Sequence, residues 1–119
     1  MSVNGLLQWQ WEGYRRYHQV RASLLLHIVA VPVFIVASIA LIGALISGRL
    51  ILALIMLGLM ALSMAVQGRG HRLEPVSPEP FSGAGNAIAR IVLEQWITFP
   101  RFVLSGGWML ALRKQNAPR

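Results

Sequence analysis

Cysteine and aspartate are both missing from this chain of 119 residues, whose only acidic side chains are four glutamates. Without cysteine the protein has no disulfide, thiolate zinc site, iron–sulfur cluster or cysteine nucleophile. Charged residues make up only 13% of the chain, against about 25% in soluble domains, while apolar residues make up 55%. No serine lies in a nucleophile-elbow context, and no glycine-rich phosphate loop is present. The composition therefore favours a membrane protein over a soluble hydrolase or nucleotide-binding protein.

The net charge of +7 has two possible meanings, nucleic-acid binding or membrane topology. The cations stand next to apolar runs, which is where membrane proteins keep them. We therefore expect membrane topology and no nucleic-acid partner. These flanking cations are Arg15, Arg16, Arg21, Arg49, Arg69 and Arg72.

Two long apolar runs occupy the centre of the chain, at residues 24–48 and 50–66. A transmembrane helix needs about 20 apolar residues, so we predict one span at 23–48 and a second at 50–70. The first run starts too late and is too long for a signal peptide. Only Ser47, Gly48 and Arg49 separate the spans, so they must form an antiparallel hairpin. The positive-inside rule then places both outer ends of the hairpin in the cytoplasm.

The seam of this hairpin is predicted from small residues. Ala37, Ala40 and Ala44 recur at helical spacing and would allow two helices to approach closely. The alternative, that these alanines are ordinary helix-forming residues, stays open at this point.

The segment before the first span is predicted to be an amphipathic helix at 4–20, lying on the cytoplasmic surface. A bend is expected within HQVRAS, residues 18–23, because His18 and His27 would point in different directions on one continuous helix. Ser23 is a candidate N-cap for the first span. The predicted inner face of the surface helix comprises Leu7, Trp11, Tyr14 and His18.

The region after the second span is predicted to add further helices to a single all-α membrane domain, 1–119. Arg90 and Glu94 stand four residues apart and can pair on one helix face. Pro100 is expected to end that helix, and Gly106-Gly107 to weaken the next one. We expect the tail, 115–119, to be disordered. The predicted elements are a loop at 75–85, an amphipathic helix at 86–99 and a short apolar helix at 101–114.

Three histidines are the strongest candidates for chemistry. His27 lies 22 residues before Arg49 and His71 lies 22 after it, so a tight hairpin puts both about 33 Å from its tip. His18 can reach the same level from the surface helix, and Glu74 follows His71 by one helical turn. Imidazoles with a carboxylate and no thiolate suit iron or another divalent first-row metal. The alternative is three structural histidines that only satisfy hydrogen bonds.

Two motifs together resemble the family of fungal 2-hydroxy fatty acid dioxygenases and their small bacterial membrane relatives. The resemblance covers roughly residues 11–80. In one position the chain departs from the family pattern, since Ser23 stands where an Asn is usual. The matching residues are Tyr14, His18, His27 and Pro32 in the first motif and Gln67, Gly70, His71, Glu74 and Pro78 in the second.

The resemblance implies an integral membrane enzyme that uses Fe(II) and dioxygen to remove one carbon from a 2-hydroxy fatty acid. It makes His18, His27 and His71 the expected iron ligands. Glu74 is expected to be a further ligand or a partner that orients an imidazole, so that His71 and Glu74 carry the chemistry. For a bacterial relative the location would be the inner membrane, with the N-terminus and the site on the cytoplasmic side.

The expected substrate contacts follow from charge and position. Arg69 and Arg72 flank His71 and would attract a carboxylate, although both are also suited to anchoring the topology. Gln67 and Tyr14 are weaker candidates for contact with the substrate. Two rival functions remain open: a non-enzymatic membrane assembly protein, and the same scaffold acting on another lipid. The oligomeric state also stays open.

Overall fold

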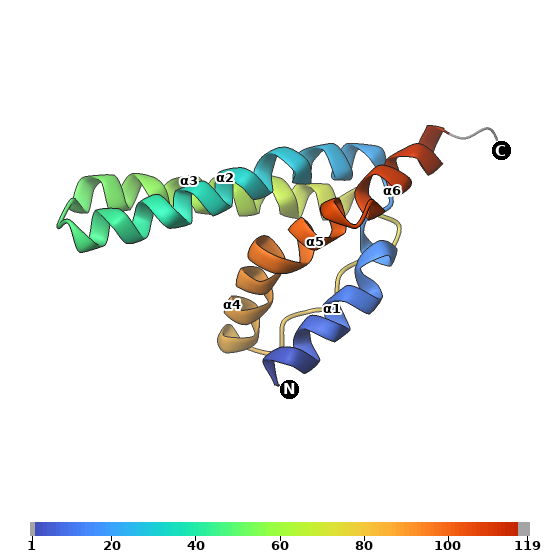
Figure 1. Cartoon of the computed structure of the whole chain (residues 1–119), viewed down its shortest axis with the longest axis horizontal. Coiled ribbons are helices and arrows are strands. Elements are labelled where there is room, and N and C mark those ends of the chain that lie inside the picture. The colour runs from blue at the N-terminus through green and yellow to red at the C-terminus, as the bar shows by residue number, and fades with distance from the viewer. Residues whose placement is uncertain (1, 117–119) are drawn as a thin grey trace.

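The computed structural model describes the backbone of residues 2–116 and the side chains of residues 2–114, and it is helical throughout with no strand in that range. The predicted all-α fold class is therefore confirmed. In Figure 1 a long hairpin carries the other helices at one of its ends. The elements are α1 (Val3–Tyr17), α2 (Arg21–Ile46), α3 (Leu50–Arg72), α4 (Ala84–Leu93), the π-helical turn η1 (Glu94–Thr98), α5 (Phe99–Leu104) and α6 (Gly107–Asn116).

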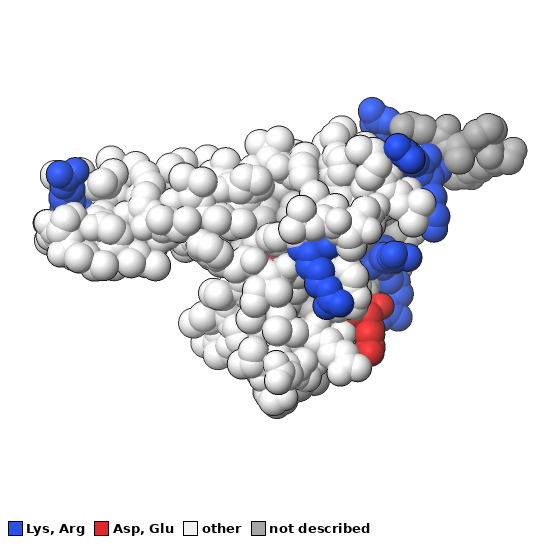
Figure 2. Space-filling model, in the orientation of Figure 1, with Lys and Arg blue, Asp and Glu red and all other residues white. Residues whose placement is uncertain are grey.

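Helices α2 and α3 form the predicted antiparallel hairpin, and both are long and apolar enough to cross a membrane. At 1.5 Å per residue they measure about 39 and 35 Å, which exceeds the thickness of a bilayer core. Only 33% and 17% of their most apolar segments are buried within the protein. The core helix of a soluble protein would be mostly buried, so these exposed apolar surfaces favour a lipid environment. Arg49 provides the isolated basic patch at the tip of the hairpin (Figure 2).

Small side chains line the contact between the two long helices. Ala30, Ala37 and Ala44 recur every seven residues on α2 and are each at most 4% exposed. The predicted stripe is therefore a packing surface at Ala37 and Ala44, whereas Ala40 is only partly buried. Near the base of the hairpin the Ser63 hydroxyl donates to the Ala30 carbonyl at 2.6 Å, which ties α3 to α2. In lipid the hydrophobic effect would not drive α2 and α3 together. Close approach and an interhelical hydrogen bond would hold them together instead.

The chain bends where the sequence predicted, at His18–Val20 between α1 and α2. The predicted Ser23 cap is wrong, because α2 begins at Arg21 with Val20 as its N-cap and no side-chain cap bond. Ser23 lies one turn inside the helix and is buried. The bend lets α1 leave the hairpin axis and run beside α4 (Figure 1).

The C-terminal helices differ from the expectation at Pro100. Helix α4 continues through η1 into α5 with helical dihedral angles at each junction, so proline does not end the helix. Proline lacks an amide donor, and the wide π turn just before it absorbs the lost hydrogen bond. The break comes instead at Ser105–Gly106, where Gly106 has φ +84° and starts a new direction. The expected helix 101–114 is therefore two helices, and α6 extends through Asn116 into the expected disordered tail, whose residues 117–119 lie outside the described range.

Helix α6 packs back onto the start of α2. The Trp108 indole N–H donates to the Leu24 carbonyl at 2.9 Å. Gly107 allows this return, since a Cβ there would lie 2.6 Å from the Phe102 ring. The resulting core at the base of the hairpin comprises Tyr14, Leu24, Val31, Phe99 and Phe102.

Candidate metal centre

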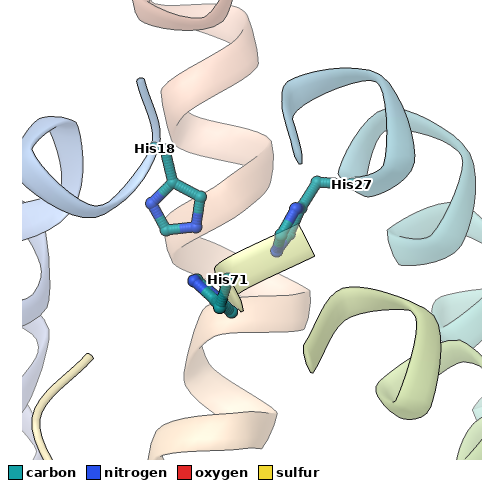
Figure 3. Close-up of side chains that lie close together, drawn as sticks. All are labelled: His18, His27 and His71. Carbon is teal, nitrogen blue, oxygen red and sulfur yellow. The ribbon is translucent and has the colours of Figure 1, made fainter. Parts of the chain in front are cut away.

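Three imidazoles from three separate segments converge at the base of the hairpin. His18 comes from the end of α1, His27 from α2 and His71 from α3, and their rings face one another in Figure 3. The ring centroids are 4.9 to 5.0 Å apart. One ligand atom from each ring lies within 4.8 Å of the others, which is close enough to bind one metal ion. The equal spacing of His27 and His71 from the hairpin tip predicted a shared level, and the structure adds that their rings lie 4.9 Å apart between centroids.

The hydrogen bonds of two imidazoles determine which ring nitrogen is free. His18 Nδ1 lies 2.9 Å from the Tyr14 carbonyl, and His27 Nδ1 lies 2.8 Å from the Ser23 carbonyl. A carbonyl can only accept, so each Nδ1 carries the proton and each Nε2 carries a lone pair. This is the tautomer that a metal-binding imidazole needs, with the opposite nitrogen fixed by a carbonyl.

Each of the three rings keeps one buried nitrogen that meets no hydrogen-bond partner among the described residues: His18 Nε2, His27 Nε2 and His71 Nδ1. Unpaired buried polar atoms are rare, because each one costs about 1–3 kcal/mol. Three of them in one cluster indicate a missing common partner. Neutral imidazole nitrogens are good ligands for divalent first-row metals, so the residues present fit such an ion.

Aromatic side chains keep water away from His18. The Tyr14 ring stacks on the His18 ring with 3.9 Å between centroids, and Phe102 contacts the edge of Tyr14. His18 is 2% exposed. Burial, and then the neighbouring His27 and His71, lower the pKa of His18 well below its ordinary value, although its bond to the Tyr14 carbonyl opposes this. His18 is therefore neutral at physiological pH, as a metal ligand must be.

Gly70 allows α3 to approach α2 at the level of the cluster. A Cβ at this position would lie 3.1 Å from the Ser23 hydroxyl and 3.3 Å from His27 Cε1. Any side chain would therefore push the two helices apart next to the imidazoles. The glycine before His71 in the second sequence motif thus has a steric function.

Glu74, an expected metal ligand, is placed differently from the imidazoles. Its carboxylate accepts hydrogen bonds from the backbone N–H groups of Gln19 and Val20, including one of 2.6 Å from Val20 to Oε1. Neither Glu74 nor Glu94 is part of the group of three histidines. Burial raises the pKa of Glu74, and the two backbone N–H donors oppose that effect. The structure thus has Glu74 holding the bend between α1 and α2, which in turn orients His18.

Glu94 is the acidic residue beside the cluster, and sequence reasoning overlooked its role. Its Oε2 lies 3.5 Å from His18 Nε2, and its side chain is 18% exposed. Burial raises the pKa of Glu94 to about 7, against the opposing influences of the Tyr14 hydroxyl and the Arg90 guanidinium. The expected pairing with Arg90 is not a direct contact, since Arg90 donates instead to the carbonyls of Glu79 and Pro80. The available signal was that Glu94 is the single charged residue in the segment 91–100.

Gln67 and Gln95 form a reciprocal amide pair one helical turn from His71. Gln67 Nε2 donates to Gln95 Oε1 at 2.8 Å, and Gln95 Nε2 donates to Gln67 Oε1 at 2.7 Å. Gln67 also donates to the Ser63 hydroxyl. Both amides are at most 1% exposed. This network locks η1 against α3 and gives Gln67 a structural role next to the site.

A cavity of about 880 Å³ opens beside the cluster. Its wall includes two of the three histidines, Glu94, and the substrate candidates Tyr14, Gln67 and Arg72. Arg69 is exposed and does not line it. The apolar part of the wall comprises Trp9, Tyr17, Met64, Phe81 and Ile91.

The loop between α3 and α4 forms one side of this cavity, and Arg90 holds it in place. The Arg90 guanidinium donates to the carbonyls of Glu79 and Pro80, and it lies over the rings of Trp9 and Phe81. One cation thus joins α1, α4 and the loop. The cavity is consequently bounded by elements that approach each other only in the folded chain.

No protein-family model, curated protein or solved structure matches this chain.

Proposed function

We propose that this protein is a membrane-embedded, Fe(II)-dependent dioxygenase that shortens 2-hydroxy fatty acids by one carbon. The observation that carries the proposal is the set of three converging imidazoles, each with an unpartnered buried nitrogen, two of which line a large and mainly apolar cavity. The reaction would be R–CH(OH)–COOH + O₂ → R–COOH + CO₂ + H₂O. In it the substrate loses its carboxyl carbon as carbon dioxide, and dioxygen is the oxidant.

His18, His27 and His71 would hold the ion. Imidazoles suit iron, zinc, copper and nickel alike, so the choice of Fe(II) follows the resemblance of the two sequence motifs to the dioxygenase family. An Fe(II) ion held by imidazoles would supply the one-electron chemistry that lets dioxygen react with an organic substrate. The backbone carbonyls of Tyr14 and Ser23 keep two of the rings in the tautomer that binds metal.

The substrate class follows from the cavity. Its apolar side chains suit an alkyl chain, and Arg72 at its wall provides a cation for a carboxylate. An acid that carries a hydroxyl on the next carbon offers two oxygens to a metal, whereas a simple fatty acid offers only its carboxylate. The exposed apolar surface of the hairpin would admit such a substrate from the bilayer.

The location proposed is an inner membrane of a bacterium, with the cluster on the cytoplasmic side. The basic side chains gather around the base of the hairpin, whereas a single patch occupies its tip (Figure 2). Cytoplasmic loops carry the excess of Lys and Arg, which supports this orientation.

The test begins with purified protein in detergent, reconstituted with ferrous iron under anaerobic conditions and freed of excess metal. We expect bound iron near one equivalent, oxygen uptake with 2-hydroxypalmitic acid, and formation of pentadecanoic acid and carbon dioxide. Palmitic acid and 3-hydroxypalmitic acid serve as matched controls and should give no uptake. The His71→Gln variant should lose both iron and turnover.

Two other outcomes would overturn the proposal. Bound iron that depends on His71, with no turnover of the 2-hydroxy acid, would favour the same scaffold acting on another lipid. No bound iron in folded protein would favour the non-enzymatic assembly protein, in which the histidines serve packing alone.

A further inference from the structure

A largely buried carboxylate, with its side chain 18% exposed, stands next to the three imidazoles. Glu94 begins η1, and its Oε2 is 3.5 Å from His18 Nε2, a distance that is too long for a hydrogen bond. Arg90, one turn earlier, donates hydrogen bonds to the loop carbonyls of Glu79 and Pro80. The nearby Tyr14 hydroxyl interacts with this carboxylate and opposes the rise of the Glu94 pKa. Glu94 is thus a partly exposed acid on the cavity wall that faces the cluster.

The Glu94 carboxylate would balance part of the charge of a metal ion bound by the three imidazoles. Three neutral imidazoles leave the full double charge of a divalent ion in a mostly buried site. An uncompensated buried charge is strongly unfavourable, and one carboxylate offsets half of it. The other glutamates do not fill this role. Glu74 is engaged with two backbone N–H groups, Glu12 accepts from Gln8 on the surface, and Glu79 is exposed.

The backbone at Glu94 is itself unusual. Residues Glu94–Thr98 form a π turn, a geometry that occurs mostly as single turns and frequently at functional sites. Its side chains reach three different neighbours: Glu94 reaches His18, Gln95 reaches Gln67, and Thr98 donates to Gln10. The turn is therefore anchored to α3 through Gln95 and to α1 through Thr98. Such anchoring fixes the carboxylate relative to the histidines.

We infer that Glu94, rather than Glu74, supplies the carboxylate of the metal centre and joins His18, His27 and His71 in holding the ion. This inference rests on the metal-binding part of the proposed function and is independent of the substrate. It makes η1 a component of the metal centre and gives Glu74 the separate role of fixing the bend at Gln19 and Val20.

The test compares two matched variants, Glu94→Gln and Glu74→Gln, with Co²⁺ as the probe. Wild type and variants are titrated with Co²⁺ in detergent, and the visible ligand-field spectrum and the dissociation constant are recorded. For Glu94→Gln we expect affinity to fall about 10- to 100-fold and the spectrum to change. Glu74→Gln should keep the wild-type spectrum, because the donor atoms are unchanged, while the loosened bend at His18 should lower affinity less than Glu94→Gln does and lower the unfolding temperature. Wild-type affinity and spectrum in Glu94→Gln, or their loss in Glu74→Gln alone, would overturn the inference.

A second measurement needs no variant at position 94. The chain contains only four glutamates, so selective ¹³C labelling of their carboxyl groups gives few NMR signals. Adding Co²⁺ should strongly shift or broaden one of them, and that signal should persist in Glu74→Gln. If no carboxyl signal responds, the inference fails even if Glu94→Gln does not fold.

The two proposals can fail separately. Suppose that Glu94→Gln loses Co²⁺ affinity but the wild type does not oxidise 2-hydroxy acids. The proposed metal centre would then stand, and the proposed reaction would be wrong. If Glu94→Gln instead binds metal with full affinity and still oxidises the 2-hydroxy acid, the proposed reaction would stand and Glu94 would not be a metal ligand.

Discussion

The tip and the base of the α2–α3 hairpin use the same two helices but are held together in different ways. Toward the tip the buried side chains are small, such as Ala37, Ala44 and Ala53, while large apolar side chains point outward. Toward the base the buried set includes His18, His27, Ser63, Gln67 and Gln95. Lipid can solvate the outward-facing tip, whereas buried polar groups must find partners inside the protein.

This difference indicates where the chain concentrates its specific interactions. At the tip, helix contact depends on shape alone, so many apolar side chains would serve equally well. At the base, each amide and imidazole has a defined neighbour, and the three unpaired imidazole nitrogens stand out against that background. Substitutions at the base should therefore have larger effects than substitutions at the tip.

The largest effect is expected at the imidazole cluster. His71→Gln keeps a neutral polar side chain but removes one of three converging ring nitrogens, so metal affinity should fall by at least about 100-fold. Metal content after anaerobic reconstitution, measured by mass spectrometry, checks this. Arg69→Ala, two residues earlier on the exposed side of α3, is the control and should retain the metal. Equal metal content in both variants would contradict the assignment of the site.

A glycine at the base should tolerate alanine much less well than a glycine near the tip. In Gly107→Ala the new Cβ would lie 2.6 Å from the Phe102 ring, and we expect a loss of about 1–3 kcal/mol in the free energy of unfolding. Gly43→Ala is the matched control, because no atom lies within 4 Å of its Cβ position. Thermal unfolding in detergent measures both. Similar stability of the two variants would remove the steric contrast between base and tip.

The Gln67–Gln95 pair should show strong coupling. Gln67→Leu leaves the buried Gln95 amide without its partner, which should reduce stability by about 1–3 kcal/mol. The double variant Gln67→Leu, Gln95→Leu removes both amides and should recover part of that loss. A double-mutant cycle, with unfolding followed by circular dichroism in detergent, gives the coupling energy. Additive losses would mean that the amide pair contributes no specific interaction.

A smaller effect is expected at the cavity wall, and it depends on the proposed substrate. Arg72→Ala removes a cation that lines the cavity, so KM for a 2-hydroxy fatty acid should rise about tenfold with little change in kcat. Arg69→Ala should leave KM unchanged, since Arg69 does not line the cavity. Steady-state oxygen uptake distinguishes the two variants. Equal KM values would assign both arginines to topology alone.

The smallest effect is expected on the outer surface of the tip. Ile42 is 57% exposed, so Ile42→Ala should change stability by less than about 0.5 kcal/mol. Unfolding in detergent and in lipid bicelles checks this. A loss comparable to that of Gly107→Ala would mean that Ile42 contacts a second copy of the chain, and the tip would then be an interface.

Parts of the site were predictable because they follow from counting along rigid helices. The short turn at Ser47–Arg49 fixes the register of the hairpin, so His27 and His71 had to meet at one level. The bend that brings in His18 was also predictable, since a nine-residue spacing is out of phase on one helix. Spacing left two roles open for Glu74, a metal ligand or a partner that orients an imidazole. Since α3 ends at Arg72 and the Glu74 carboxylate accepts from the Val20 N–H, the structure favours the second.

The sequence by itself determined the apolar hairpin, its tight turn and the level of two histidines, because these depend on local helix geometry and hydropathy. Only the tertiary structure decided that Glu94 faces the cluster, that Gln67 and Gln95 pair, and that α4 continues past Pro100. Each of these depends on how the segment beyond the 75–83 connection returns to the base of the hairpin. That return is set by packing and by hydrogen bonds between residues far apart in the chain, which no local pattern encodes.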